Sequence, residues 1–261
     1  MASRKSRKDT LKIDWPNFEK LHLRLPIPGR INHIYFAYIR KNASTSLTRY
    51  LVDQTDFASL FPDEDQDIRF RQLALSHGTT EENELRRHDS SAVILREPVR
   101  RAYSTFCNKV VAEAGANDFW STVDGRIGPN ARSLTTEEFF RGYFSPTAQG
   151  KVDAHLIPQS RHMWSRSYDY VIRLDELYFW ATTTLGAAAA ERFFLVRLNA
   201  TERPGSDPHP RITIRELQAR FQMGRGIPSL EWFSARVGDQ IASIYFEDLR
   251  IWQTSRFWGS K

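Results

Sequence analysis

The chain has 261 residues, of which 41% are hydrophobic and 13% aromatic. This is enough apolar material for one sizeable core, and it excludes an intrinsically disordered chain. The formal net charge is +6, from 37 basic and 31 acidic residues. Such a mild excess suits an anionic ligand, but it is too weak and too interspersed with acidic residues to indicate a nucleic-acid-binding protein.

Cysteine usage and the N-terminal sequence bear on the cellular compartment. Cys107 is the single cysteine, so no intrachain disulfide forms, which favours a reducing compartment. The start of the chain, MASRKSRKDTLKIDW, is charged and lacks the apolar segment of a signal peptide. No stretch approaches the roughly 18–20 apolar residues of a membrane span. We therefore expect a cytoplasmic protein without a membrane span.

Residues 1–30 are basic and contain several prolines, and we interpret them as an extension lying over a single domain of residues 31–261. HIYFAYI (33–39) is a short run of Ile and aromatic residues, typical of a buried strand. The next segment, 45–54, spaces Leu47, Tyr50 and Leu51 on one face of a helix. A strand therefore leads directly into a helix in this part of the chain.

The rest of the chain continues the alternation of strands and helices. Apolar runs predict four further strands, at 69–76, 91–97, 168–174 and 192–199. Helices are predicted from Pro98 to Gly115 and over 135–144, 175–189, 213–222 and 229–253, the second of them opening on a Thr-x-x-Glu capping box. Residues 116–134 and 200–211 are rich in polar residues, Gly or Pro and are predicted as loops. We therefore predict an α/β fold, P-loop-like and three-layered, with a mostly parallel central sheet flanked by helices.

The segment RKNASTS (40–46) stands where the first strand turns into its helix. Such a turn exposes backbone N–H groups at the positive end of the helix dipole. Ala43 and Ser44 are small enough to let an anion approach, Ser44 to Ser46 add hydroxyl donors, and Lys41 adds a mobile charge. The segment therefore predicts a phosphate site, although it is no Walker A loop because GxxxxGK[ST] is missing. The alternative is an ordinary Ser/Thr-capped helix that follows a solvated Arg-Lys pair.

A second segment, REPVRRAYS (96–104), also runs from a strand into a helix. Arg96 at the strand end and Ser104 two turns into the helix could hold a second anion, unless Arg96 pairs with Glu97 or another carboxylate. Ligands of parallel sheets bind beyond the carboxyl ends of the strands, where both segments are expected. Two anion sites at one edge indicate a ligand that carries two separate phosphate groups.

Together the two segments resemble the motifs of PAPS-dependent sulfotransferases, in particular the carbohydrate and uronyl 2-O-sulfotransferase branch. Lys41-Asn42-Ala43-Ser44-Thr45-Ser46 matches the family's Lys-x-Ala-Ser-Thr-Ser, which grips the 5′-phosphosulfate. Arg96-Glu97-Pro98-x-x-Arg101-x-x-Ser104 matches its Arg-Asp-Pro-x-x-Arg-x-x-Ser, which grips the 3′-phosphate. Arg40 departs from the usual Pro and adds a charge beside the phosphosulfate. The resemblance thus implies PAPS as donor, bound by Arg40, Lys41, Asn42, Ala43, Ser44, Thr45, Ser46, Arg96 and Ser104.

Weaker similarities extend the resemblance over about residues 33–252. DAHLIPQSRHMW (153–164) followed by YDYVIRLDEL (168–177) is similar to the family's His-x-x-Pro-Gln segment with its Tyr-Asp pair. LNAT (198–201) and IASIYFEDLRIW (241–252) are similar to a later Asn-containing strand end and a C-terminal Tyr-x-x-Asp-Leu helix. The order of all these segments agrees with the family.

Sulfuryl transfer needs positioned charges and, for an alcohol acceptor, a base. Lys41 can follow the negative charge that develops on the leaving 5′-phosphate. His77 is expected at the carboxyl edge after the strand at 69–76, and the resemblance implies a catalytic histidine in a similar place. The alternatives are that His77 bonds its own turn, or that His88 is the base. His155 matches a family histidine that is either structural or lines the acceptor pocket.

No metal site is expected, because the single cysteine and scattered histidines lack ligand spacing. The predicted partners are PAPS and a hydroxylated acceptor, either a glycan or a small metabolite, and not nucleic acid. An amine acceptor remains an alternative, as does a family member that binds the nucleotide without catalysis. A nucleotide kinase with an atypical loop is the rival enzyme, and it requires Mg²⁺ and ATP.

Overall fold

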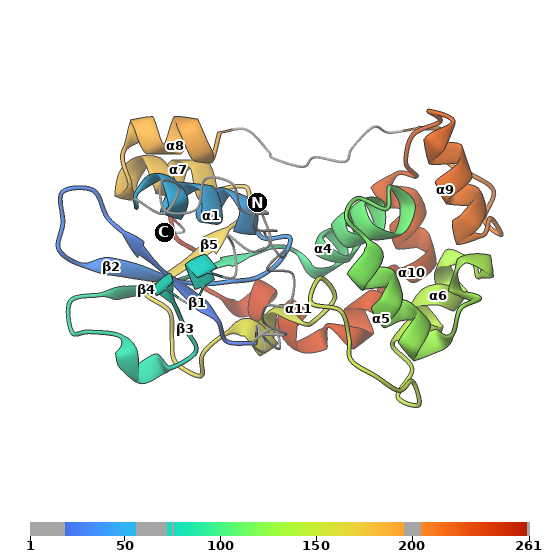
Figure 1. Cartoon of the computed structure of the whole chain (residues 1–261), viewed down its shortest axis with the longest axis horizontal. Helices are drawn as coiled ribbons and strands as arrows, with labels where there is room; N and C mark the ends of the chain where they lie inside the picture. Colours follow the sequence, from blue (N-terminus) through green and yellow to red (C-terminus); the bar gives the residue numbers. More distant parts are fainter. Residues whose placement is uncertain (1–18, 56–71, 75, 196–204, 260–261) are drawn as a thin grey trace, which may run out of the picture.

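In this computed structural model, residues 19–55, 72–74, 76–195 and 205–259 are described. They form a sheet region and a helical region (Figure 1). Each region has its own hydrophobic core, the first centred on the sheet and the second on packed helices. The chain passes from sheet to helices at the end of β4 (Ser90–Leu95), where α4 (Pro98–Thr105) begins.

The sheet has five strands in the order β3-β1-β2-β4-β5. The other four strands are β1 (His22–Pro26), β2 (His33–Ala37), β3 (Gly78–Thr79) and β5 (Tyr170–Arg173). Strand β1 pairs antiparallel with both β2 and β3, whereas the β2–β4 and β4–β5 pairs are parallel. The sheet is therefore mixed, and the prediction of a mostly parallel sheet holds only for its β2-β4-β5 half.

Strand β1 corrects the interpretation of residues 1–30 as an extension that lies over the core. Residues 22–26 are part of the sheet, where Leu23 and Leu25 are fully buried. Residues 1–18 lie outside the described part of the chain. The antiparallel register, with His22 opposite Ala37 and Pro26 opposite His33, allows a short connection between β1 and β2. Pro26 at the strand end and the Pro28-Gly29 turn interrupt the apolar pattern, so the sequence did not indicate this hairpin.

One face of the sheet is covered by α1 (Ser44–Asp53), α7 (Leu177–Thr184) and α8 (Ala187–Phe193), which lie together in Figure 1. Phe36, Tyr50 and Trp180 are buried in this core. The other face packs Val93 and Leu95 against Phe257 and the partly buried Ile251 and Trp252 from the C-terminal segment. The second cover is thus much thinner than the first, so the expected three-layer arrangement is only partly formed.

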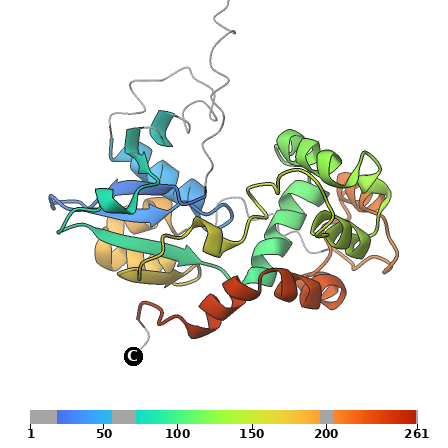
Figure 2. The same cartoon turned by 90° about the horizontal axis from the view of Figure 1, so that it is seen from below.

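The helical region holds α4 and a π-helical turn, Phe106–Val111, which continues it. Around them pack α5 (Asn117–Ile127), α6 (Thr136–Tyr143), α9 (Ile214–Gln222) and α10 (Leu230–Ile244). Phe106, Phe140 and Phe233 meet at ring-centroid distances of 5.1–6.4 Å in its centre. Helix α11 (Phe246–Thr254) then runs back towards the sheet (Figure 2).

The structure confirms most of the elements predicted from the sequence. Strands overlap the predicted ranges 33–39, 91–97 and 168–174, and helices occur within 98–115, 135–144 and 213–222. The expected capping box joins Thr135 to Glu138, and a second one joins Thr213 to Glu216. The helix expected over 175–189 is interrupted at Gly186, and the one over 229–253 at Tyr245.

Three predictions of local structure are wrong. The described residues of 69–76 are helical. Arg192 and Phe193, at the start of the strand predicted over 192–199, are helical too, and residues 196–199 lie outside the described part of the chain. Short apolar runs of this kind fit a buried helical turn as well as a strand. The loop expected over 116–134 contains α5 and a 3₁₀ turn, Ala131–Ser133. Helix α5 buries Phe119, Trp120 and Val123 on one side, a periodicity that its polar residues and Gly125 concealed.

Two other short 3₁₀ helices, Glu82–Glu84 and Gln159–His162, complete the secondary structure of the described residues. Within the described residues, no helix is long and apolar enough to cross a membrane.

Candidate active site

The first anion segment forms a strained turn between β2 and α1. Lys41 and Ala43 both have left-handed backbones, with φ of 70° and 58°. For residues other than glycine this conformation costs about 1–2 kcal/mol each, and it persists where the surrounding structure enforces it. Ala43 precedes the first helical residue and has no side chain that could cap the helix. The N–H groups of Ser44 to Ser46 are therefore available to an anion, as the sequence predicted.

Asn42, between the two strained residues, faces inward. Its side chain is buried, and its Nδ2 donates to the carbonyl of Ile94 (2.7 Å) and to Oε1 of Gln159 (2.5 Å). Its backbone N–H donates to the carbonyl of Ile39. Because these donors are used within the protein, the Asn42 side chain holds the turn in place. The predicted part of Asn42 in binding PAPS stays a prediction.

The second anion segment begins where β4 ends. Glu97 is the N-cap of α4, and its two carboxylate oxygens accept from the N–H groups of Val99 (3.0 Å) and Arg100 (2.7 Å). This accounts for an acidic residue directly after Arg96. Ser104 lies half-buried two turns along the same helix. Arg96 and Ser104 therefore project from one strand–helix junction.

Arg101 joins the two anion segments. Its guanidinium is fully buried, and its Nε donates to the carbonyl of Arg40 (3.2 Å). Burial lowers the pKa of Arg101, and the negative charge of Asp248 opposes this lowering. Arg101 thus fixes the turn at 40–43 against α4, a structural role that the sequence motif alone did not reveal.

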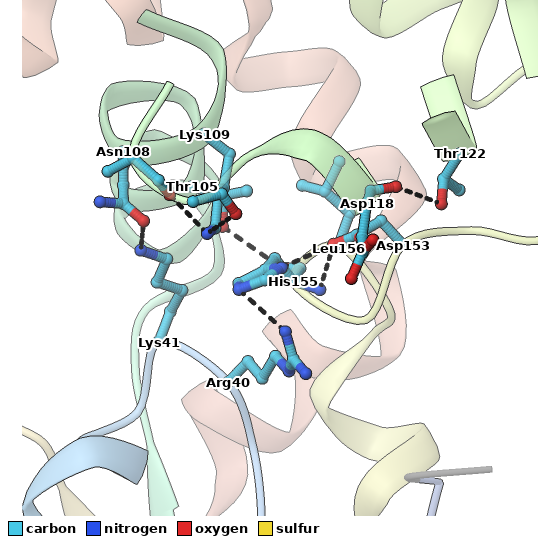
Figure 3. A network of polar contacts seen from close by, with 12 residues as sticks. Arg40, Lys41, Thr105, Asn108, Lys109, Asp118, Thr122, Asp153, His155 and Leu156 are labelled. Carbon is cyan, nitrogen blue, oxygen red and sulfur yellow. Dashed lines mark hydrogen bonds and ion pairs between the residues drawn. The ribbon is translucent and has the colours of Figure 1, made fainter. Parts of the chain in front are cut away.

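Lys41 lies at the centre of a cluster of positive charges. Its Nζ donates to Oδ1 of Asn108 (2.7 Å), which the π-helical turn presents (Figure 3). Burial, together with the charges of Lys109, Arg96 and Arg40, lowers the pKa of Lys41 to about 7. The structure therefore brings the cations of both predicted anion segments within electrostatic reach of one another. It also adds two residues, Asn108 and Lys109, for which the sequence gave no recognisable signal.

His155 is the histidine that the structure places beside Lys41. Its Nδ1 pairs with Oδ1 of Asp153 (2.7 Å), and its Nε2 faces Nη1 of Arg40 at 3.3 Å (Figure 3). Burial lowers the pKa of His155 to about 4, and the charges of Arg40 and Lys41 contribute to this lowering. Burial opposes ionisation of Asp153, but its bonds with His155 hold the pKa of this carboxyl below its usual value. His155 is therefore neutral, with Nδ1–H donating to the carboxylate and Nε2 accepting.

His77 occupies a different part of the sheet. It ends a helical segment, and β3 begins at the next residue, so His77 precedes a strand instead of following one. Because β1 is antiparallel to both β2 and β3, His77 lies at the amino end of a strand that runs parallel to β2. Burial and the charges of Arg24 and His33 lower its pKa. The expected position of His77 at the carboxyl edge, beside Lys41, is therefore wrong, and the rival His88 lies exposed.

A comparison with protein-family models matches residues 30–209, well over half of the chain, to the sulfotransferase family. The chain belongs to the sulfotransferase family. Both anion segments and the Asp153–His155 pair of this sulfotransferase lie within the matched residues. No curated protein and no solved structure matches the chain. In the described part of the sulfotransferase, no group of three or more His, Cys, Asp or Glu residues could hold a metal ion.

The lowered pKa of Lys41 predicts that this sulfotransferase takes up a proton when a phosphate ligand binds. At pH 8, above the pKa of about 7, Lys41 is mostly neutral in the free protein, and an anion favours its charged form. Affinity for adenosine 3′,5′-bisphosphate should therefore fall as the pH rises from 7 to 9. Calorimetry at pH 8 in two buffers of different ionisation enthalpy measures the uptake. Uptake that persists unchanged in Lys41→Met would contradict its assignment to Lys41.

Proposed function

We propose that this sulfotransferase transfers the sulfuryl group of PAPS to an acceptor hydroxyl and releases adenosine 3′,5′-bisphosphate. The observation that carries the proposal is the hydrogen bonding between the two anion segments, in which Arg101 donates to the Arg40 carbonyl and Asn42 donates to the Ile94 carbonyl, because it joins segments that lie far apart in the sequence. One cluster of positive charge then suits a ligand with phosphate groups at two ends. The family match and the resemblance of both motifs support the same donor.

The residues present fit such a donor. The N–H groups of Ser44 to Ser46, at the start of α1, suit the 5′-phosphosulfate. Lys41 suits the bridge to the sulfuryl group, where charge develops as the bond breaks. Arg96 and Ser104 suit the 3′-phosphate, at the junction of β4 and α4. When bound, PAPS supplies an activated sulfuryl group, and the protein supplies positioning and charge.

For the base we propose His155 in place of His77. The Asp153 carboxylate orients the ring and leaves Nε2 as the proton acceptor, on the side of Arg40 and Lys41. An acceptor hydroxyl would take the place of Arg40 Nη1 as the hydrogen-bond partner of His155 Nε2. The pKa of about 4 reflects burial among cations, so an anionic donor, which offsets those cations, would raise it. His155 would thereby become a stronger base once the donor is bound.

The position of Arg40 supports an anionic acceptor. Its guanidinium lies at His155 Nε2, where the reacting hydroxyl is proposed to bind. A guanidinium pairs well with a carboxylate, so a sugar that carries a carboxylate near its hydroxyl suits the site. We therefore propose a glycan of the uronyl type as acceptor, in line with the resemblance to the uronyl 2-O branch. A small hydroxylated metabolite with an acidic group meets the same requirement.

Calorimetric titration with adenosine 3′,5′-bisphosphate, ADP and ATP, each with and without Mg²⁺, tests the donor. We expect tight, metal-independent binding of the bisphosphate, weakened at least about tenfold in Arg96→Ala, since a hydrogen bond to a charged group contributes about 1.5–3 kcal/mol. Arg100→Ala is the matched control, because Arg100 is an exposed arginine four residues further on. A preference for ATP with Mg²⁺ would overturn the proposal and indicate a kinase.

A further inference from the structure

Gln159 occupies a position between the two anion segments. It is almost completely buried, with 1% of its surface exposed, and it belongs to the 3₁₀ turn Gln159–His162. Its Oε1 accepts from Asn42 Nδ2 and from the backbone N–H of Arg96 (3.0 Å). Its Nε2 donates to the backbone carbonyl of Arg96 (2.9 Å). One amide group therefore bonds to the turn before α1 and to Arg96, the residue directly after β4.

Gln159 is itself held from the C-terminal part of the chain. Asp248, in the first turn of α11, is 3% exposed, and its two carboxylate oxygens accept from the N–H groups of Gln159 (2.6 Å) and Ser160 (2.8 Å). Asp248 lies beyond residue 209, where the family match ends. A carboxylate that receives two backbone N–H bonds in a buried position fixes that backbone firmly. A series of hydrogen bonds thus runs from Asp248 through Gln159 to Asn42 and Arg96.

We propose that Gln159, held by Asp248, is a positioning residue that sets the spacing between the two anion-binding segments. It touches neither phosphate. It fixes the distance between the N–H groups at the start of α1 and the Arg96 junction, so that one ligand with two phosphates reaches both. The inference rests on the proposed function, since it requires a bisphosphate donor.

A fixed spacing has a thermodynamic signature. Once one phosphate is bound, the second binds as an intramolecular group, and the gain in affinity depends on how well the spacing of the sites matches the ligand. Loosening the spacing should remove this gain while leaving each separate site nearly intact. A side chain that merely stabilises the fold would instead weaken all ligands alike.

The experiment compares adenosine 3′,5′-bisphosphate with 5′-AMP and 3′-AMP, in wild type and Gln159→Met, by calorimetry. We expect the Kd of the bisphosphate to rise at least about tenfold in Gln159→Met, and the Kd of each monophosphate to change by less than about twofold. Gln218→Met is the matched control. Gln218 is also buried and donates one bond from Nε2, to the Val110 carbonyl (2.8 Å), but contacts neither anion segment. Its variant should keep the wild-type ratio between the three ligands.

Two further variants keep the inference falsifiable if Gln159→Met does not fold. Gln159→Glu retains the two bonds accepted by Oε1 and replaces only the Nε2 donor to the Arg96 carbonyl. Asp248→Asn removes the negative charge that holds the backbone of Gln159. Both should weaken the bisphosphate selectively, and the loss in Gln159→Glu should recover at low pH as the new carboxyl is protonated. Equal weakening of all three ligands would overturn the positioning role. A wild type that binds the bisphosphate no better than the monophosphates would overturn the proposed function instead.

Discussion

Replacing Lys41 by methionine is expected to lower kcat for sulfuryl transfer at least about 100-fold, the usual loss when a donor to developing negative charge is removed. Methionine keeps the length of the side chain and removes the charge beside Arg96 and Lys109. Release of adenosine 3′,5′-bisphosphate from PAPS, with a glucuronic acid oligosaccharide as acceptor, measures the effect. Wild-type turnover in this variant would overturn the role of Lys41.

Lys109→Met is the control for Lys41→Met. The Nζ of Lys109 bonds to the carbonyls of Ala114 (2.6 Å) and Gly115 (2.8 Å), and its charge lies near Lys41. If catalysis needs a lysine at the leaving phosphate, Lys109→Met should lose much less activity. Equal losses would indicate that only the total positive charge matters.

The Lys41→Met variant should also be more stable than wild type at neutral pH. The pKa of Lys41 is about 7 in the folded protein and 10.5 without the fold, so the unfolded chain binds more protons between these values. Stability therefore rises with pH through this window, and the cost of charging Lys41 is largest near and below pH 7. The gain in Lys41→Met should shrink as the pH approaches 10. Thermal unfolding at pH 7 and pH 9.5 measures it, and a loss of stability in Lys41→Met would contradict the lowered pKa.

Replacing His155 by alanine is expected to lower kcat about 10²–10⁴-fold, which is the typical contribution of a general base. The KM for PAPS should change little, because His155 is assigned to the acceptor side. Asp153→Asn should lower kcat by an intermediate amount, because the His155 ring remains but loses the carboxylate that orients it. The same assay of bisphosphate release measures kcat for both variants and the KM for PAPS.

His77→Ala is the matched control for the base. His77 lies near Arg24 and near His33, the first residue of β2, whereas Lys41 follows the end of this strand. Its removal should therefore leave kcat within about threefold of wild type, as for most exposed or half-buried surface positions. A large loss in His77→Ala, with turnover preserved in His155→Ala, would restore the original expectation that His77 is the base.

The sequence by itself determined the local elements of the site. The apolar runs at 33–39 and 91–97 form β2 and β4, and each continues into a helix whose start carries the anion motif. These features depend on neighbouring residues, through strand propensity, helix capping and the N–H groups that a helix start leaves free. The apolar run at 168–174 likewise predicted β5, and the Thr-x-x-Glu pattern predicted α6.

The tertiary structure alone decided which distant residues complete the site. Lys41 meets Asn108 from 67 residues away, Arg40 meets His155 from 115 away, and Asn42 meets Gln159 from 117 away. No local pattern encodes such pairs, because they arise from the packing of the helical region against the sheet. Packing likewise decided the position of His77, because the described residues before it are helical and His77 therefore precedes β3 instead of following a strand. Neighbouring residues therefore determined where anions can bind, and long-range packing decided which histidine, amide and carboxylate serve those sites.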